Sequence, residues 1–261
     1  MKLMISLCLM LAVAFISIPI QADTTHIAVA SNFTGAMKAL INVFEESSTH
    51  KVKASYGSSG KIYAQIKHGA PFQLFFSADQ AKPLALYQQG LTTEKPFTYA
   101  FGALALWSSH ADFQHNELNL LQSNDFNKLS FANPKLAPYG IAAREVLENL
   151  NLIQASQKKW VQGENIAQAY QFVGSGNADL GFVALSQVKN KAPYWLVPSK
   201  LYSPIRQDAV LLSAGSSISS GRNKAASAFL HFIRSEQSQA IIESFGYTAK
   251  RRLLEDTGAI Q

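Results

Sequence analysis

Short apolar runs alternate with amphipathic patterns along nearly the whole chain. Residues 26–30 form the first run, which is typical of a buried strand. In the stretch that follows, Met37, Leu40 and Phe44 recur at the spacing of one helix face, which predicts a helix over residues 34–47. Two further strand–helix pairs come directly after it. Three such units in succession favour a mostly parallel sheet with helices on both faces.

The alternation continues to the C-terminal region, with one change in its middle. The run at residues 97–107 is long and almost wholly apolar, with Gly102 inside it, so we expect it to pass from one sheet to another. No Gly/Ser-rich or charged linker separates the halves, so we expect strands to join them. The predicted strands are 26–30, 52–56, 74–77, 97–107, 129–132, 159–161, 180–183 and 209–213, and the predicted helices are 34–47, 60–68, 81–89, 141–150, 165–175, 224–234 and 236–245.

These patterns predict an α/β chain with two lobes, each a mostly parallel sheet flanked by helices, joined by a two-strand hinge. A chain of 261 residues is long enough to bury a sizeable core. We place lobe 1 at residues 23–101 plus 208–261, because the C-terminal helices are expected to return to it, and lobe 2 at residues 102–207.

Residues 1–22 have the pattern of a cleavable signal peptide. Lys2 comes before an uncharged apolar stretch at residues 3–16, and small residues precede Asp23. An uncleaved anchor is the alternative, but the apolar stretch is shorter than the ~20 residues that a spanning helix needs. We therefore expect a periplasmic protein. Cys8, the only cysteine, lies in this segment, so the mature chain is expected to have no disulfide, catalytic thiol or cysteine metal site.

The charge pattern does not favour nucleic acid. The formal net charge is +6, yet Lys and Arg are dispersed, and the densest groups, such as residues 250–252, are too short to line a groove. A mild positive field would instead steer a small anion toward the protein. We expect a monomer with a small-molecule ligand.

Four loops lie where a predicted strand ends and a predicted helix begins. They cover residues 31–32, 57–60, 133–140 and 164–168. A helix start offers unsatisfied N–H groups and the positive end of the helix dipole, and such places hold anions. Capping by Ser31 and Asn32 alone would explain one such loop, but not four. The sequence therefore predicts a cleft that holds an oxyanion with neutral donors.

Evidence for catalysis is weak. Residues 58–61 match the S-x-x-K signature of penicillin-recognising serine enzymes, but no K-T-G motif accompanies them, and they do not form a P-loop. The six histidines are scattered and the carboxylates are unpaired apart from Glu45 and Glu46, so neither a zinc site nor an acid–base pair is indicated. We expect a binding protein with no cofactor and no metal-ion ligands rather than an enzyme.

Five ordered motifs carry a family resemblance over essentially the whole mature chain. At these places the chain resembles the periplasmic molybdate-binding proteins of ABC importers. The resemblance implies a two-lobed periplasmic binding protein of the second type, with the anion between the lobes and a membrane permease with its ATPase as partners. The motifs are Ala-Ser-Asn-Phe-Thr at 30–34, the segment 56–71 that begins Tyr-Gly-Ser-Ser-Gly-Lys, Phe-Phe-Ser-Ala-Asp at 75–79, the Asn-Pro to Tyr-Gly loop at 133–140, and Gly-Phe-Val-Ala at 181–184.

By the same resemblance, the ligand positions fall on specific residues of this chain. They are Ser31, Asn32, Ser59, Tyr139 and the backbone N–H of Ile166. Some family members carry a ligand-binding Tyr at the position that is Ala184 here. This chain therefore resembles the branch that uses Asn32 and Tyr139 instead.

The donor chemistry narrows the choice of anion. A fully ionised tetrahedral dianion can be held by N–H and O–H donors alone, whereas a protonated phosphate also needs an acceptor. Apart from Glu164 at the start of the fourth loop, no carboxylate lies in the predicted loops, and Asp79 is the nearest one outside them. Molybdate and tungstate are thus favoured over phosphate. Binding of sulfate or another oxyanion, and a sensory module without transport, stay open as alternatives.

Overall fold

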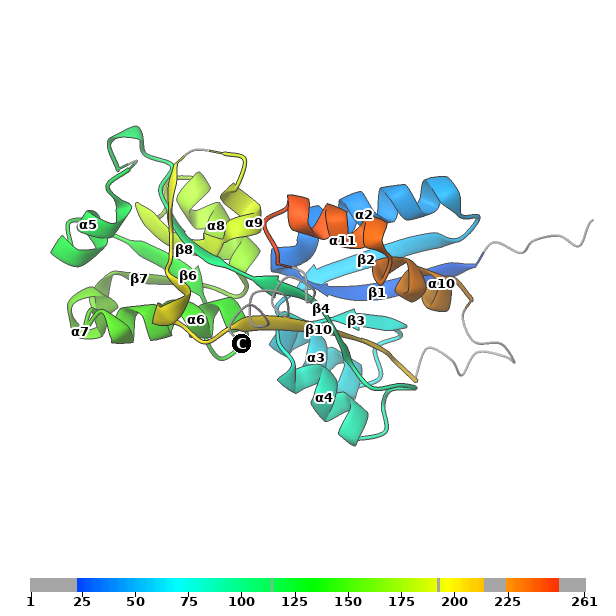
Figure 1. Ribbon diagram of the computed structural model, residues 1–261. Coiled ribbons are helices and arrows are strands. Elements are labelled where there is room, and N and C mark those ends of the chain that lie inside the picture. Colours follow the sequence, from blue (N-terminus) through cyan, green and yellow to red (C-terminus); the bar gives the residue numbers. More distant parts are fainter. Residues whose placement is uncertain (1–22, 114, 192, 214–223, 249–261) are drawn as a thin grey trace, which may run out of the picture.

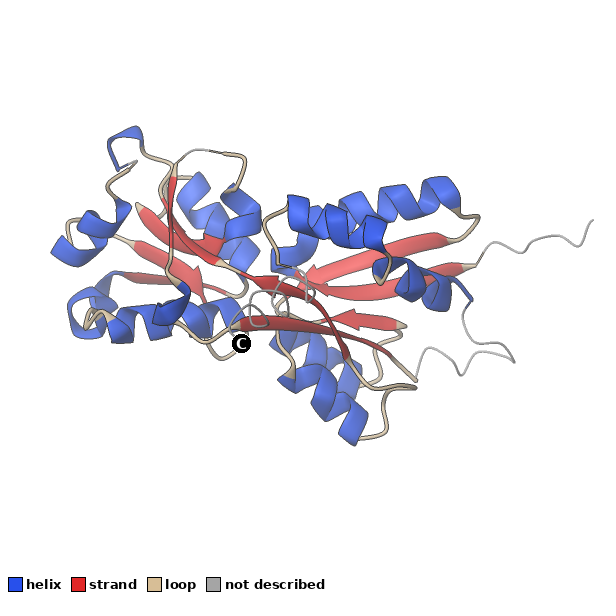
Figure 2. Cartoon of the chain, in the orientation of Figure 1, coloured by secondary structure: helices blue, strands red, loops and turns tan. Residues whose placement is uncertain are grey.

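Two five-stranded sheets lie side by side in the computed structural model, each with helices on both faces (Figure 1, Figure 2). The structure describes residues 23–113, 115–191, 193–213 and 224–248. The predicted signal peptide at residues 1–22, with Cys8, and the basic group at 250–252 lie outside the described residues. In the described ranges, no helix has the length and apolar character needed to cross a bilayer.

The elements follow the predicted alternation. The strands are β1 (Thr24–Ala30), β2 (Lys51–Gly57), β3 (Leu74–Phe76), β4 (Phe97–Gly102), β5 (Leu104–Trp107), β6 (Leu129–Ala132), β7 (Trp160–Gly163), β8 (Leu180–Ala184), β9 (Tyr194–Leu196) and β10 (Ile205–Leu211). The α-helices are α2 (Thr34–Ser47), α3 (Ser59–Lys67), α4 (Ala81–Gln88), α5 (Glu117–Ser123), α6 (Pro138–Asn149), α7 (Ile153–Ser156), α8 (Ile166–Gly174), α9 (Leu185–Val188), α10 (Lys224–Ile233) and α11 (Glu236–Ser244).

The first sheet has the strand order β2-β1-β3-β10-β4. Strands β1, β2 and β3 are parallel, and β10 runs antiparallel to both of its neighbours. Side chains alternate between the two faces. Ile27 and Val29 pack toward α2, α10 and α11, whereas Ala28 packs toward α3 and α4. Both faces are therefore buried, as a mostly parallel sheet requires.

The second sheet has the order β7-β6-β8-β5-β9 and repeats the plan. Strands β6, β7 and β8 are parallel, while β5 pairs antiparallel with β8 and β9. Leu104 and Leu106 pack in the cluster that includes α6, and Ala105 and Trp107 pack against α8 and α9 on the other face. The predicted two-lobed α/β fold is confirmed by this architecture.

The predicted crossing of residues 97–107 between the sheets is also confirmed. β4 belongs to the first sheet and β5 to the second, with only Ala103 between them. The returning strand β10 pairs with β4 from Ile205 opposite Gly102 onward, so the two connecting strands lie together. The lobe boundaries given above stay a prediction.

Two predicted elements begin three or more residues earlier than expected. Helix α6 begins at Pro138 instead of residue 141, because proline suits the first turn of a helix, where no N–H partner is needed. Strand β10 begins at Ile205 instead of residue 209. The first half of β10 was not predicted, because Gln207 and Asp208 are polar and interrupt the apolar pattern of a buried strand. In the fold, however, both residues are buried.

Candidate functional site

The expected ligand residues meet at one small cavity between the two sheets. The cavity is small and partly open to solvent, and all the residues that border it are neutral. All five expected residues are among them, and none is more than 7% exposed. The lining residues are Ala30, Ser31, Asn32, Gly57, Ser58, Ser59, Ala78, Ala137, Pro138, Tyr139 and Ile166.

Strand register explains why these loops meet. The last residues of the parallel strands β1 and β2, Ala30 and Gly57, are partners, so the chain leaves both strands at the same edge. In the second sheet, Ala132 of β6 and Gly163 of β7 are partners in the same way. A helix start follows each of these strand ends, so unsatisfied N–H groups and positive dipole ends gather at the cavity. Such an arrangement attracts an anion.

The start of α8 leaves one backbone donor free. The side chain of Asn165 caps the helix and accepts from the N–H groups of Ala167 and Gln168, at 3.0 and 3.1 Å. The N–H of Ile166, the first helical residue, has no acceptor among the described residues. Ile166 lines the cavity, so this N–H is a candidate ligand donor.

The serines at the start of α3 have different roles. Ser58 is the N-cap, and its Oγ accepts from the backbone N–H of Lys61 at 3.4 Å. The Oγ of Ser59 accepts from the backbone N–H of Ala78 at 3.0 Å. Because that bond uses a lone pair, the hydroxyl proton of Ser59 is still available to a ligand. The proton of Ser58 is available in the same way, so the choice of Ser59 as the ligand residue stays a prediction.

Tyr139 supplies a buried hydroxyl without a partner. Its side chain is 1% exposed, and its OH has no hydrogen-bond partner in the described part of the chain. Most buried polar atoms in proteins are paired, so an unpaired one at a cavity points to a ligand. Burial raises the pKa of this phenol well above its ordinary value and outweighs the lowering effect of the nearby Asn32 side chain, whose contact does not meet hydrogen-bond geometry, so the phenol stays a protonated donor.

Asn32 is held by a buried polar network. Its Nδ2 donates to Gln207 Oε1 at 2.8 Å and to the Tyr247 hydroxyl at 3.2 Å. Its backbone carbonyl accepts from the Tyr247 hydroxyl at 2.7 Å and from Ser186 Oγ at 3.0 Å. Ser186 lies in α9, beside the second sheet. The network therefore joins the Asn32 loop to the connecting strand β10 and to the other lobe.

The sequence did not reveal these supporting residues. Gln207, Tyr247 and Ser186 lie 175, 215 and 154 positions from Asn32, and no local motif marks any of them. The one available signal was the pair of polar residues 207–208 next to a predicted buried strand.

The lobes touch directly beside the cavity. Gly60 N–H donates to the carbonyl of Leu136 at 2.9 Å, and Lys61 Nζ pairs with Glu164 at 3.0 Å. A β-carbon at Gly60 would lie 2.9 Å from that same carbonyl oxygen, so a side chain here would separate the lobes. The arrangement is that of closed lobes.

The residues considered for catalysis are engaged elsewhere. Lys61 Nζ contacts Glu164 instead of Ser58, so the S-x-x-K sequence does not form a Ser–Lys pair. The carboxylate of Asp79 accepts from the N–H and Nζ of Lys82. No carboxylate borders the small cavity. Among the described residues, no group of three or more His, Cys, Asp or Glu side chains could hold a metal ion.

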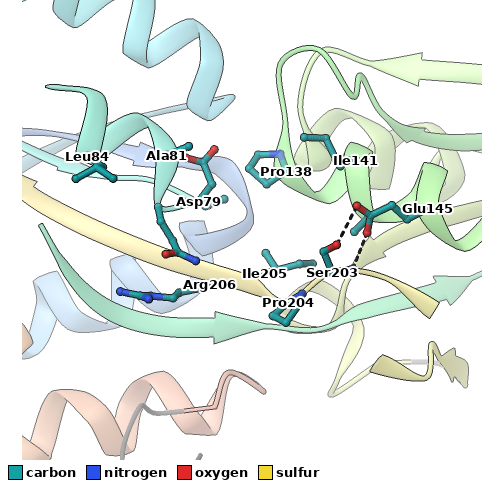
Figure 3. A pocket seen from close by; sticks show the side chains of 13 residues that line it. Asp79, Ala81, Leu84, Pro138, Ile141, Glu145, Ser203, Pro204, Ile205 and Arg206 are labelled. Atoms are coloured by element: carbon teal, nitrogen blue, oxygen red, sulfur yellow. Dashed lines mark hydrogen bonds between the residues drawn. The ribbon is translucent and has the colours of Figure 1, made fainter. Parts of the chain in front are cut away.

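A larger open groove adjoins the small cavity, and the two share Ala78 and Pro138 (Figure 3). Ala81 and Leu84 of α4 lie on one side of it, and Ile141 of α6 lies on the other. Glu145 points to Ser203 and accepts from its N–H and Oγ at 2.5 and 3.1 Å. The groove is mainly apolar, so the convergent donors belong to the small cavity.

Comparison with known proteins agrees with this fold. A model of the family described as "Bacterial extracellular solute-binding protein" matches residues 25–248. The molybdate-binding protein ModA of Azotobacter vinelandii is 45% identical over 233 residues, which cover 87% of this chain and 90% of that protein. ModA of Rhodobacter capsulatus is 40% identical over 238 residues, or 90% of this chain and 92% of that protein.

A solved structure gives the same result. The periplasmic molybdate-binding protein of Azotobacter vinelandii superposes with a TM-score of 0.80 at 37% identity, over 86% of this chain and 98% of that one. Sequence and fold therefore agree, and the chain belongs to the family of bacterial extracellular solute-binding proteins.

Proposed function

We propose that this chain captures molybdate, and with it tungstate, outside the cytoplasm and delivers the anion to an ABC importer. The observation that carries the proposal is the small cavity at which four strand ends and helix starts converge without a carboxylate. Relatives at 45% and 40% identity that are named as molybdate-binding proteins support the choice of anion.

The proposed donor set consists of five residues. Ser31 and Ser59 contribute hydroxyls, Tyr139 contributes a phenol, and Ile166 contributes its N–H. Asn32 contributes its backbone N–H, because both hydrogens of its side-chain amide donate to Gln207 and Tyr247. All of these groups are neutral, so they can solvate a dianion without a counter-charge and without an acceptor that would suit a protonated anion. Hydrogen bonds to a charged group contribute about 1.5–3 kcal/mol each.

Closure explains how binding could be reported to a permease. The donors come from both lobes, so an anion between them favours the closed arrangement by its differential contacts. The Lys61–Glu164 pair and the Gly60–Leu136 hydrogen bond form only when the lobes meet. The closed lobes would then present one continuous surface to the permease and its ATPase.

The test is isothermal titration of the chain from Asp23 onward with molybdate, tungstate, sulfate and phosphate at one pH. We expect one-to-one binding of the first two anions and none of phosphate. Binding of sulfate or phosphate alone would overturn the choice of anion, and no binding of any of the four would overturn the proposal as a whole.

The proposed route to the periplasm has its own test. Expression of the full chain in a bacterium should yield protein that begins at Asp23 in the periplasmic fraction. N-terminal sequencing measures the cleavage, and a chain that retains residues 1–22 would contradict it.

A further inference from the structure

Gln207 lies at the centre of the connecting strand β10 and is completely buried. The pairing of β10 with β4 shifts here, because Gln207 is the partner of Ala100 while Asp208 is the partner of Thr98. Tyr99 is therefore an extra residue in β4, as in a β-bulge. Bulges re-aim side chains, and this one places the Tyr99 hydroxyl 3.2 Å from Gln207 Oε1.

Only the oxygen of the Gln207 side-chain amide forms hydrogen bonds with other described residues. Its Oε1 accepts from Asn32 Nδ2 at 2.8 Å and from the Tyr99 hydroxyl. Its Nε2 is buried and has no partner among the described residues. An amide with a fixed oxygen has a fixed NH2 direction, so this group, like the phenol of Tyr139, is a buried donor without an acceptor.

The two unpaired groups lie close together beside Gly102. A β-carbon at Gly102 would lie 2.1 Å from the Tyr139 hydroxyl and 2.9 Å from Gln207 Nε2, so these two atoms are at most 5.0 Å apart. Only a residue without a side chain leaves room for both groups at this point. They therefore need to approach by no more than about 2 Å to reach hydrogen-bond distance.

We propose that Gln207 is a positioning residue for the anion: its oxygen holds Asn32, and its NH2 group donates to the phenol oxygen of Tyr139. This inference rests on the proposed function. A phenol has one proton, and when an N–H donates to its oxygen, that proton must point elsewhere. Here it points into the cavity. From its place on the connecting strand, Gln207 thereby orients two ligand residues, Asn32 of one lobe and Tyr139 of the other.

Substitution by Glu gives a pH-dependent test. Gln207→Glu keeps an acceptor for Asn32, but when ionised it has no donor for Tyr139 and places a negative charge near the bound anion. When protonated, the carboxyl regains an O–H donor and is neutral. Burial raises the pKa of such a carboxyl. Anion affinity should therefore fall about tenfold for each pH unit above that pKa, because binding then requires uptake of one proton.

The surroundings of Gln207 add no competing titration of their own to this test. The phenols of Tyr99 and Tyr139 lie next to it, and that of Tyr247 contacts its partner Asn32; burial raises the pKa of each of the three. The next charged groups are Asp208, which accepts from Thr98 and Arg206, and Asp79, which is paired with Lys82. Wild-type protein measured over the same pH range corrects for all of these groups and for the anion itself.

Three variants complete the design, with molybdate as the probe and titration from about pH 6 to about pH 9. Gln88→Glu makes the same change at an exposed position of α4 and should bind like wild type at every pH. Gln207→Met keeps the size but removes both polar groups, and should weaken binding about 10- to 100-fold without pH dependence. The third variant, Tyr139→Phe, is combined with Gln207→Met. In the Tyr139→Phe background, Gln207→Met should have a clearly smaller effect, because part of its role acts through Tyr139.

The outcomes separate this inference from the proposed function. If wild type does not bind molybdate, the proposed function fails. If wild type binds but Gln207→Glu loses no affinity, or loses the same amount at every pH, the positioning role is wrong. Full additivity of Gln207→Met with Tyr139→Phe would overturn it as well. Because Gln207→Met introduces no charge, the cycle can still be measured if the Glu variant does not fold.

Discussion

Replacing Tyr139 by Phe should separate ligand binding from stability. The substitution removes one oxygen from a side chain that is 1% exposed and whose hydroxyl has no protein partner among the described residues. A hydrogen bond to a charged group contributes about 1.5–3 kcal/mol, so loss of the bond to the anion should raise the Kd about 10- to 150-fold. The free energy of unfolding without ligand should not fall, because leaving a buried hydroxyl unpaired itself costs about 1–3 kcal/mol.

Tyr247 offers a matched control. Its hydroxyl is also buried, but it donates to the carbonyl of Asn32 at 2.7 Å and contacts Ser186 Oγ at 3.0 Å. Tyr247→Phe should therefore lower the free energy of unfolding by about 1 kcal/mol, which Tyr139→Phe should not do. Urea titration of both variants gives the stabilities, and isothermal titration with molybdate gives the affinities.

The opposite pattern would refute the reasoning about Tyr139. If Tyr139→Phe unfolds at lower urea while binding molybdate as wild type does, its hydroxyl stabilises the fold and is not a ligand donor. If both properties are unchanged, the phenol has no role in either.

Three further predictions follow from the same contacts. Gly102→Ala should raise the Kd for molybdate at least about tenfold, because the new β-carbon would lie 2.1 Å from the Tyr139 hydroxyl and displace it. A titration that gives the wild-type Kd would contradict the role of this hydroxyl in binding. Lys61→Ala removes the ion pair with Glu164, whose two side chains are 54% and 40% exposed, so the free energy of unfolding should change by no more than about 1 kcal/mol. Binding of molybdate should persist. Loss of all binding would show instead that the ion pair holds the lobes closed. The buried phenols of Tyr99, Tyr139 and Tyr247 have raised pKa values, so the stability that they contribute should be full below about pH 10 and lost as the pH rises further. Tyrosinate absorbance during an alkaline titration should show these three ionising only when the protein unfolds. Their ionisation in the folded protein would contradict this prediction.

Much of the fold could be predicted because the strand–helix alternation is local. Parallel strands end at one edge of a sheet, so the loops at residues 31–32 and 57–60 had to meet once their strands were adjacent. The helix predicted at residues 34–47 has those bounds in the structure, because its apolar face is complete and buried. The same reasoning placed the helix starts near Tyr139 and Ile166 at the second sheet.

The residues that hold the ligand residues in place could not be predicted, because their hydrogen bonds and ion pairs join positions that are far apart in the sequence. In the sequence, a polar residue such as Gln207 argues against a buried strand. Its hydrogen-bond partners Asn32 and Tyr99 come near it only in the folded chain. The ion pair between Lys61 and Glu164 likewise joins loops of different lobes, 103 positions apart. Short elements such as α9 and β9 carry too few residues to show a period.

The position of β10 between β3 and β4 also sets an order of folding. All strands of the second sheet come from residues 104–196, so that sheet can form as soon as this stretch has emerged. The first sheet cannot close until β10 arrives, since β4 has no other neighbour within it. Until then β3, with the apolar sequence Leu74–Phe76, has an unpaired edge. An apolar strand edge that stays unpaired is a site of aggregation until the last strand arrives.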